Sequence, residues 1–170
     1  MRWLLFTLVM SVLGMSMIVY SIRMEFQDIS LDQIHYANEH AVHDAGLWVQ
    51  QDRLSEGDIV FDQSKAHDAY INSLQYNLPV DDALQSQMFL IEGDIKILDK
   101  KYIDHDYIDP NTGAKVSFPY IYIYEDSSRN LYFERVIFGP SIVSVIEANI
   151  YNADKPSFDV AIQEYKGAIN

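Results

Sequence analysis

The sequence predicts an α+β protein in which an N-terminal transmembrane helix and a helical segment precede an antiparallel β-meander of four to five strands packed on a helix. Three observations predict this order. Residues 3–22 are uncharged and mostly apolar, residues 30–78 repeat their apolar positions every three to four residues, and from Met88 the apolar period becomes two. Helices that precede a run of strands are typical of the α+β class.

The apolar run Trp3–Ile22 has the length of a membrane span. As a helix, its twenty residues would be about 30 Å long, which matches the hydrocarbon core of a bilayer. Arg2 precedes the run, Arg23 follows it, and the first acidic residue is Glu25. We therefore expect residues 3–22 to contact membrane lipid.

This run divides the chain into a membrane anchor at residues 1–23 and an α+β domain at residues 24–170. Acidic residues crowd only the far side of the run, so the positive-inside rule places the amino end in the cytoplasm and the domain outside. The alternative is a cleaved signal peptide, for which Val19–Ser21 offers a cleavage site. The length of the run and the single basic residue before it favour a retained anchor at the cell membrane.

Composition limits the classes of function. The domain has enough residues for one core, and its ten basic and twenty-five acidic residues give it a net charge of −15. Such a surface repels nucleic acid and anionic lipid, so we expect no nucleic-acid partner. Because cysteine is absent, disulfides, thiol nucleophiles and thiolate metal sites are excluded.

The first helical pattern of the domain begins at a capping box, Ser30 to Gln33, and should extend to about Leu54. Gly57 is suited to a left-handed turn just beyond its end. Alanines four residues apart would give the helix a flat packing surface. Its apolar stripe comprises Leu31, Ile34, Ala37, Ala41, Ala45 and Trp48, interrupted by Asn38.

A second helix is predicted from about Gln63 to Asn77, with Asp62 as its N-cap and Pro79 closing it. One further turn or a short helix is expected at residues 81–84. Alternation of apolar and polar residues then predicts strands separated by turn sequences. The strands are expected around Ile91–Ile97, from Tyr102 to Ile108, at Val116–Tyr124, at Leu131–Phe138 and at Ile142–Tyr151, with turns at Asp109–Gly113 and Asp126–Asn130.

A histidine cluster on the first domain helix is the strongest candidate for metal chemistry. His35, Glu39 and His43 are four residues apart and share one helix face, close to His40. Imidazole and carboxylate at this spacing could bind zinc, but a face turned away from the alanine stripe would be solvated. We expect these side chains to face solvent and to hold no metal.

Two other segments are candidate binding sites. Asp104–Asp106 could suggest calcium but lacks the glycine and glutamate of an EF-hand loop. Tyrosines in residues 120–124 could form a binding platform or be covered by a helix. The sequence contains no Gly-x-Ser-x-Gly elbow and no glycine-rich phosphate loop, so we expect no catalytic residues, no cofactor and no enzymatic activity.

The order of elements resembles that of pilins and of the membrane-anchored TadE-type minor pilins. The resemblance lies in Trp3–Ile22, the alanine-faced helix and the strands from Met88 to Tyr151. Type IV prepilins carry a processing glycine before the apolar run and a glutamate at its fifth position. Here Gly14 lies inside the run and Glu25 lies beyond it.

The resemblance implies a single-pass membrane protein that is a non-enzymatic component of a pilus-like or cell-envelope assembly. Its partners would be other envelope or pilus proteins, further copies of this chain included. The small residues Thr7, Ser11, Gly14 and Ser21 form one stripe on the anchor along which a second helix could approach. The alternative function is an extracytoplasmic ligand-binding or sensory domain.

Overall fold

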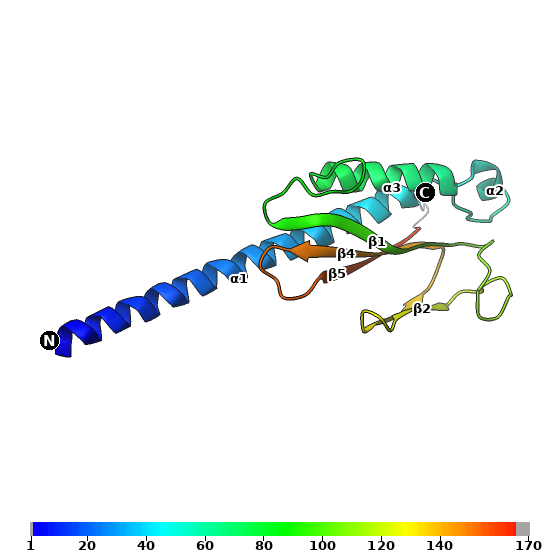
Figure 1. Ribbon diagram of the computed structural model, residues 1–170. Helices are drawn as coiled ribbons and strands as arrows, with labels where there is room; N and C mark the ends of the chain where they lie inside the picture. Colours follow the sequence, from blue (N-terminus) through cyan, green and yellow to red (C-terminus); the bar gives the residue numbers. More distant parts are fainter. Residues whose placement is uncertain (1, 166–170) are drawn as a thin grey trace.

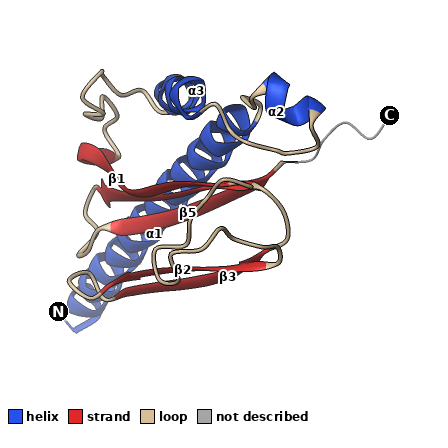
Figure 2. Ribbon diagram, turned by 90° about the vertical axis from the view of Figure 1, so that its right-hand side faces the viewer, coloured by secondary structure: helices blue, strands red, loops and turns tan. Residues whose placement is uncertain are grey.

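The computed structural model describes residues 2–165 and confirms the α+β class, with five strands (Figure 1). A long helix projects from a domain in which a sheet is covered by helices on one face and by a hairpin on the other (Figure 2). The elements in chain order are α1 (Arg2–Gly46), α2 (Gln51–Ser55), α3 (Gln63–Asn77), β1 (Ile91–Ile103), β2 (Tyr120–Asp126), β3 (Leu131–Ile137), β4 (Ser141–Ile150) and β5 (Ser157–Glu164).

Helix α1 is continuous over 45 residues and joins the apolar run to the domain without a break. The predicted helix start at Ser30 is therefore wrong. The Ser30 hydroxyl donates to the carbonyl of Phe26 one turn earlier, 2.8 Å away, instead of capping a new helix. No proline lies within α1, so nothing removes a hydrogen bond of the helix where the anchor meets the domain.

The end of α1 also differs from the prediction, because the helix stops at Gly46 and not near Leu54. A short bridge between Val49 and Phe61 follows, and α2 occupies the intervening loop. Gly57 has φ of +92°, as expected for the left-handed residue that ends the segment.

The prediction for α3 is confirmed at both ends. Asp62 accepts a hydrogen bond from the backbone amide of Lys65 at 3.3 Å, and the helix ends at Asn77, two residues before Pro79. The acidic segment after it forms no helix. Instead, the side chain of Asp81 accepts from the amides of Ala83 and Gln85, which holds a turn.

The strands form two antiparallel sheets. One sheet has the order β1-β4-β5, and the other is the β2-β3 hairpin, inserted in the chain between β1 and β4. Strand β4 therefore lies between β1, which is distant in sequence, and β5, which follows it directly. Ile97 of β1 is opposite Ile146, and Val145 is opposite Val160 of β5. A simple meander in chain order is not formed, and β5 is a strand that the sequence analysis did not predict.

Strand β1 is longer than predicted and contains two register shifts. Gly93, at φ +73°, lies in the first, where the strand turns aside to bond the loop at residues 84–86. Tyr102 and Ile103 belong to the end of β1 and not to a following strand. Ile108 makes only an isolated bridge with Lys115, so the predicted strand over residues 102–108 is wrong.

The main core lies between the sheet and the two long helices. Small buried residues of α1 allow α3, β4 and β5 to approach closely, and β4 is buried along almost its whole length. Leu31 and Trp48, predicted to face this core, are instead about half exposed. Residues of this core include Ile34, Ala37, Ala41, Ala45, Tyr70, Leu74, Ile91, Ile142 and Ile146.

A second, smaller core lies on the opposite face of the sheet, beneath the hairpin. Tyr122 of β2 and Ile137 of β3 pack on Ile103 and Val143 of the sheet. Arg129 in the hairpin turn donates to the buried carboxylate of Glu147 in β4 at 2.7 Å. The hairpin is therefore attached to the sheet by an apolar layer and by one ion pair at its end.

Candidate functional site

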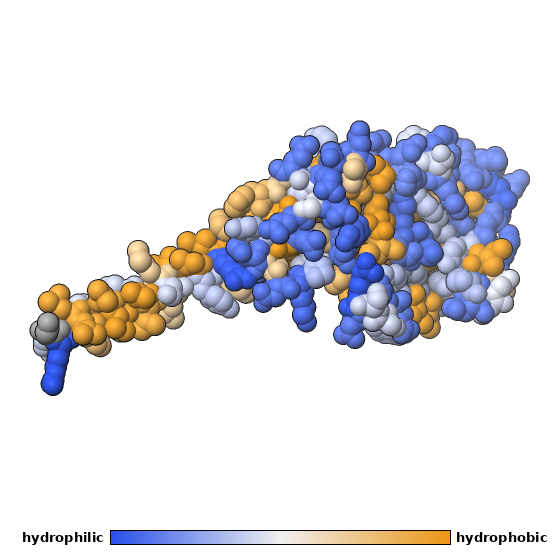
Figure 3. All heavy atoms as spheres, viewed as in Figure 1, coloured by the Kyte–Doolittle hydropathy of each residue, from blue (hydrophilic) through white to orange (hydrophobic). Residues whose placement is uncertain are grey.

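The first half of α1 has the surface of a membrane-spanning helix. Every large apolar side chain from Trp3 to Ile22 is exposed, and the projecting helix is visibly apolar against a mostly polar domain (Figure 3). The hydroxyls of Thr7, Ser11 and Ser16 donate to carbonyls three or four residues earlier in the same helix. These three hydroxyls are thus satisfied within the helix, as lipid requires, and the segment is long and apolar enough to cross a membrane.

The histidine cluster lies on the outer face of α1. The side chains of His35 and His43 are more than half exposed, and His43 contacts Asp44 next to it. His35 instead contacts Asp159 of β5, with 2.7 Å between Nδ1 and the carboxylate, and Glu39 at 3.3 Å. Within residues 2–165, no three histidine or acidic side chains are grouped so as to hold a metal ion.

The contact of His35 belongs to a buried polar network that sequence reasoning did not find. Asn38, which interrupts the apolar stripe of α1, donates to Asp159 at 2.8 Å and accepts from the Tyr70 hydroxyl at 3.1 Å. The same hydroxyl lies 2.7 Å from that of Ser144 in β4. Helices α1 and α3 and strands β4 and β5 therefore share one set of hydrogen bonds inside the core.

Protonation in this network follows from its contacts. The hydrogen bond to Asp159 raises the pKa of His35, although partial burial opposes the rise. Burial raises the pKa of Tyr70 far above its ordinary value. Tyr70 therefore stays neutral and acts as a hydrogen-bond donor inside the core, while the His35 imidazole lies at the outer edge of the network.

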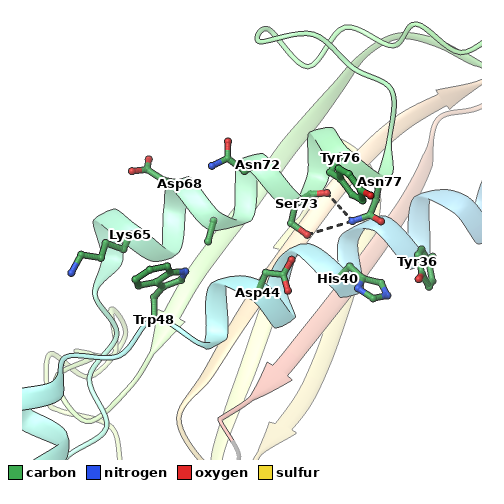
Figure 4. A pocket seen from close by; sticks show the side chains of 11 residues that line it. Tyr36, His40, Asp44, Trp48, Lys65, Asp68, Asn72, Ser73, Tyr76 and Asn77 are labelled. Atoms are coloured by element: carbon green, nitrogen blue, oxygen red, sulfur yellow. Dashed lines mark hydrogen bonds between the residues drawn. The ribbon is translucent and has the colours of Figure 1, made fainter.

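A groove of about 830 Å³ runs between α1 and α3 on the surface of the domain (Figure 4). Trp48 lies at one end of it with the ammonium of Lys65 5.8 Å from its ring, and Tyr36 and His40 stack at the other, their ring centroids 4.1 Å apart. The remaining polar lining includes Asp44, Asp68, Asn72, Ser73 and Asn77.

This groove combines aromatic faces with carboxylates and amides, and its size is that of small-molecule sites. No residue in it pairs a nucleophile with a base at hydrogen-bonding distance. Its chemistry suits the binding of a polar or cationic ligand. Sequence reasoning missed it because its two walls come from helices that are separate in the chain.

The acidic loop at residues 104–109 is a structural junction. Asp104 is buried and accepts from the amides of Phe61 and Asp106, both at 3.0 Å; burial raises its pKa. Asp106 binds Lys115 at 2.6 Å and Arg53 at 3.3 Å, and the hydrogen bond from Lys115 foremost lowers its pKa. These carboxylates are engaged by protein donors, so the loop is not arranged as a calcium site.

The tyrosines of β2 do not form an outward platform. Tyr122 is buried against the sheet and donates to Asp99 at 2.7 Å, while Tyr120 and Tyr124 are half-buried on the same side. The outward face of the hairpin carries Ile121 and Ile123 instead, each about half exposed. Coverage of this strand by a helix was the predicted alternative to a binding platform. The strand is covered on one face, but by the sheet and not by a helix.

Lys100 of β1 is partly buried at the edge of the sheet, and this changes its pKa. Burial lowers it to about 8, and the ammonium lies 4.6 Å from the centre of the Tyr70 ring and against His67. It packs against the Tyr70 ring from the edge of the sheet.

In comparisons with known proteins, no family model matches the chain, and no curated protein or solved structure is similar to it. Inferences about its function therefore depend on its sequence and its geometry.

Proposed function

We propose that this chain is a single-pass membrane protein whose domain is displayed outside the cell as a non-enzymatic component of a pilus-like or cell-envelope assembly. The observation that carries the proposal is the continuity of α1. Its first half is a fully exposed apolar helix, and its second half supplies the centre of the domain core. A membrane segment built into the core in this way presents the domain in a defined orientation.

Two further features support a role in assembly. The described residues contain a groove but no catalytic constellation, and the exposed face of the β2-β3 hairpin carries Ile121, Ile123 and Val136 beside two glutamates. The helix-then-sheet order is shared with pilins, whose long N-terminal helix both spans the membrane and packs beneath a sheet. The acidic domain suits the aqueous side of an envelope, where it meets cationic partners or divalent ions.

The test of anchoring and topology uses the full-length chain in intact cells. We expect the protein to stay in membranes after an alkaline wash and its domain to be digested by external protease. Val12→Arg puts a charge at the centre of the span, at a cost of about 2.5–3.5 kcal/mol, and should release the protein. Recovery of a mature protein that begins near Ile22 would refute the retained anchor, and protection of the domain from protease would refute the proposed topology.

The test of assembly is the size of the complex in mild detergent. A component of an assembly migrates in native gels well above its own mass of 19.6 kDa and loses this migration with Val12→Arg. Genes for a secretion ATPase and a polytopic platform protein beside its gene would agree. A chain that remains monomeric at its native abundance contradicts the assembly role.

The α1-α3 groove favours a second candidate function, an extracytoplasmic ligand-binding or sensory domain. Trp48 lies at the groove, so a ligand held there would change its fluorescence. Screening amino acids, polyamines and short sugars against the wild type and against Trp48→Phe tests this function directly. Saturable changes that vanish in Trp48→Phe, with a parallel loss of thermal stabilisation by the ligand in Asp68→Asn, would favour it over assembly.

A further inference from the structure

We propose that the turn between β4 and β5, together with Phe89 and Tyr151, lies in the headgroup layer of the bilayer that holds the anchor. The inference rests on the proposed membrane anchoring and adds a second contact between the domain and the lipid. The domain would then touch the membrane with one end of its sheet and would not hang from the helix alone. The partner is the lipid surface itself.

The first step is the position of the turn along α1. Arg23 donates to the carbonyl of Asn152, and the amide of Gln27 donates to the same carbonyl at 3.1 Å. Arg23 also lies 4.0 Å from Asp154. The turn at residues 151–156 is therefore fixed at the level of the helix turn that begins with Arg23, and Figure 1 shows it beside α1 at the end of the domain from which the anchor projects.

The second step is the depth of that level in a membrane. If residues 3–22 fill the hydrocarbon core, Arg23 is the first residue beyond it. The headgroup layer is about 5–7 Å thick on each side, and residues 23–27 rise by about 6 Å along the helix. The backbone carbonyl that binds both Arg23 and Gln27 thus lies within the headgroup layer, and so does the turn that carries it.

The third step is the chemistry presented at that depth. The rings of Phe89 and Tyr151 lie 5.0 Å apart, and the amide of Tyr151 donates to the carbonyl of Leu90 at 2.9 Å. Phe89 is 75% exposed and Tyr151 40% exposed, and neither residue lines the groove. Aromatic side chains at this depth are typical of the membrane interface, where an apolar ring and a polar edge are both satisfied.

Charge determines which lipid the contact needs. At the turn, Arg23 and Lys155 offset Asp154, while the domain as a whole is strongly acidic. Attraction to anionic lipid is therefore not the source of the contact. A zwitterionic surface such as phosphatidylcholine is sufficient, and the contact should persist at high salt because it depends on inserted aromatic rings.

The test uses the absence of cysteine, which lets one fluorophore be placed at will in the full-length protein in phosphatidylcholine vesicles. Lys155→Cys places the label on the turn, Ser55→Cys places it at the opposite end of the domain, and Met10→Cys places it in the anchor. Lipids with a spin label near the headgroup quench a nearby fluorophore. We expect strong quenching at position 155, unchanged in 1 M salt, and none at position 55.

The variants test the aromatic pair. Phe89→Ser with Tyr151→Ser should abolish quenching at position 155, whereas Phe138→Ser, which removes an equally exposed ring elsewhere, should leave it unchanged. Near-ultraviolet circular dichroism checks that both variants are folded. The comparison of positions 155 and 55 in the otherwise unchanged protein decides the question even where the double variant fails to fold.

The outcomes separate the two proposals. Quenching of the Met10→Cys label by lipids spin-labelled deep in the acyl chain establishes the anchor independently. If the label at position 10 is quenched and the label at position 155 behaves like that at position 55, the membrane anchor is supported and the headgroup contact is refuted. The rings of Phe89 and Tyr151 would then contact solvent or another protein. If position 10 is not quenched, both proposals fail.

Discussion

Replacing Tyr70 by phenylalanine tests whether the buried polar network holds the helices to the sheet. The ring stays and only the hydroxyl is lost, together with its bonds to Asn38 at 3.1 Å and to Ser144 at 2.7 Å. Both partners are fully buried, so the Asn38 carbonyl oxygen loses its donor where water does not reach it. An orphaned buried acceptor costs about 1–3 kcal/mol, which we take as the expected loss in free energy of unfolding.

The assay is thermal unfolding of the full-length protein in detergent, followed by near-ultraviolet circular dichroism, which reports the packing of the domain and not the anchor. A loss of about 2 kcal/mol lowers the midpoint by roughly 4–8 °C for a protein of this size. Tyr76→Phe is the matched control, since this tyrosine of the same helix is 89% exposed. Equal midpoints for Tyr70→Phe and the wild type would refute the stabilising role of the network.

Three further predictions concern single side chains of the domain. Ala41→Leu overfills the contact of α1 with its neighbours and should lower stability by about 1–3 kcal/mol in the same assay, and an unchanged midpoint would mean that this helix face is loosely packed. Lys100→Met should raise the midpoint at pH 7, because the variant removes a charge that the folded wild type holds partly buried. The pKa of Lys100 is about 8 in the folded state and lies below its unfolded value, so the advantage of the variant over the wild type shrinks as pH rises from about 8 to 10.5. Destabilisation by Lys100→Met at every pH would contradict this reasoning. The pKa of His35 is raised in the folded state, so its contribution to the free energy of unfolding is complete below about pH 6.5 and is lost as pH rises through the folded pKa. His35→Gln should remove this pH dependence of stability, which is under about 1 kcal/mol because the His35 side chain is half exposed. A pH dependence that persists in the variant would exclude His35 as its source.

The elements that sequence reasoning predicted best are those defined by local chemistry. Asp62 and Pro79 bound α3 correctly because capping and helix termination depend on adjacent residues. The helix start predicted at Ser30 was wrong, although it also depended on adjacent residues. A capping box is compatible with a helix start but does not require one, and no residue between the anchor and Ser30 interrupts the helix.

The pairing of strands that are distant in sequence could not be predicted from local sequence patterns. Alternation predicted strands and their faces, but it did not show that β1 pairs with β4 across the inserted hairpin. Strand β5 carried a usable signal, since Phe158, Val160 and Ile162 alternate after Pro156. The polar network and the groove could not be predicted, because each joins side chains of α1 to α3 or to the sheet, and periodicity within one element says nothing about its neighbour.

If residues 3–22 span a bilayer as proposed, the unbroken helix α1 would make the protein a lever with its pivot in the membrane. The 23 residues from Met24 to Gly46 would then extend about 34 Å beyond the hydrocarbon core, and a 10° change in helix tilt would swing the far end of the helix by about 6 Å. Transmembrane helices tilt in response to bilayer thickness and to lateral packing. In a bilayer, a change of tilt would therefore displace the domain without any hinge, and a pull on the domain would reach residues 3–22 through the backbone hydrogen bonds of α1.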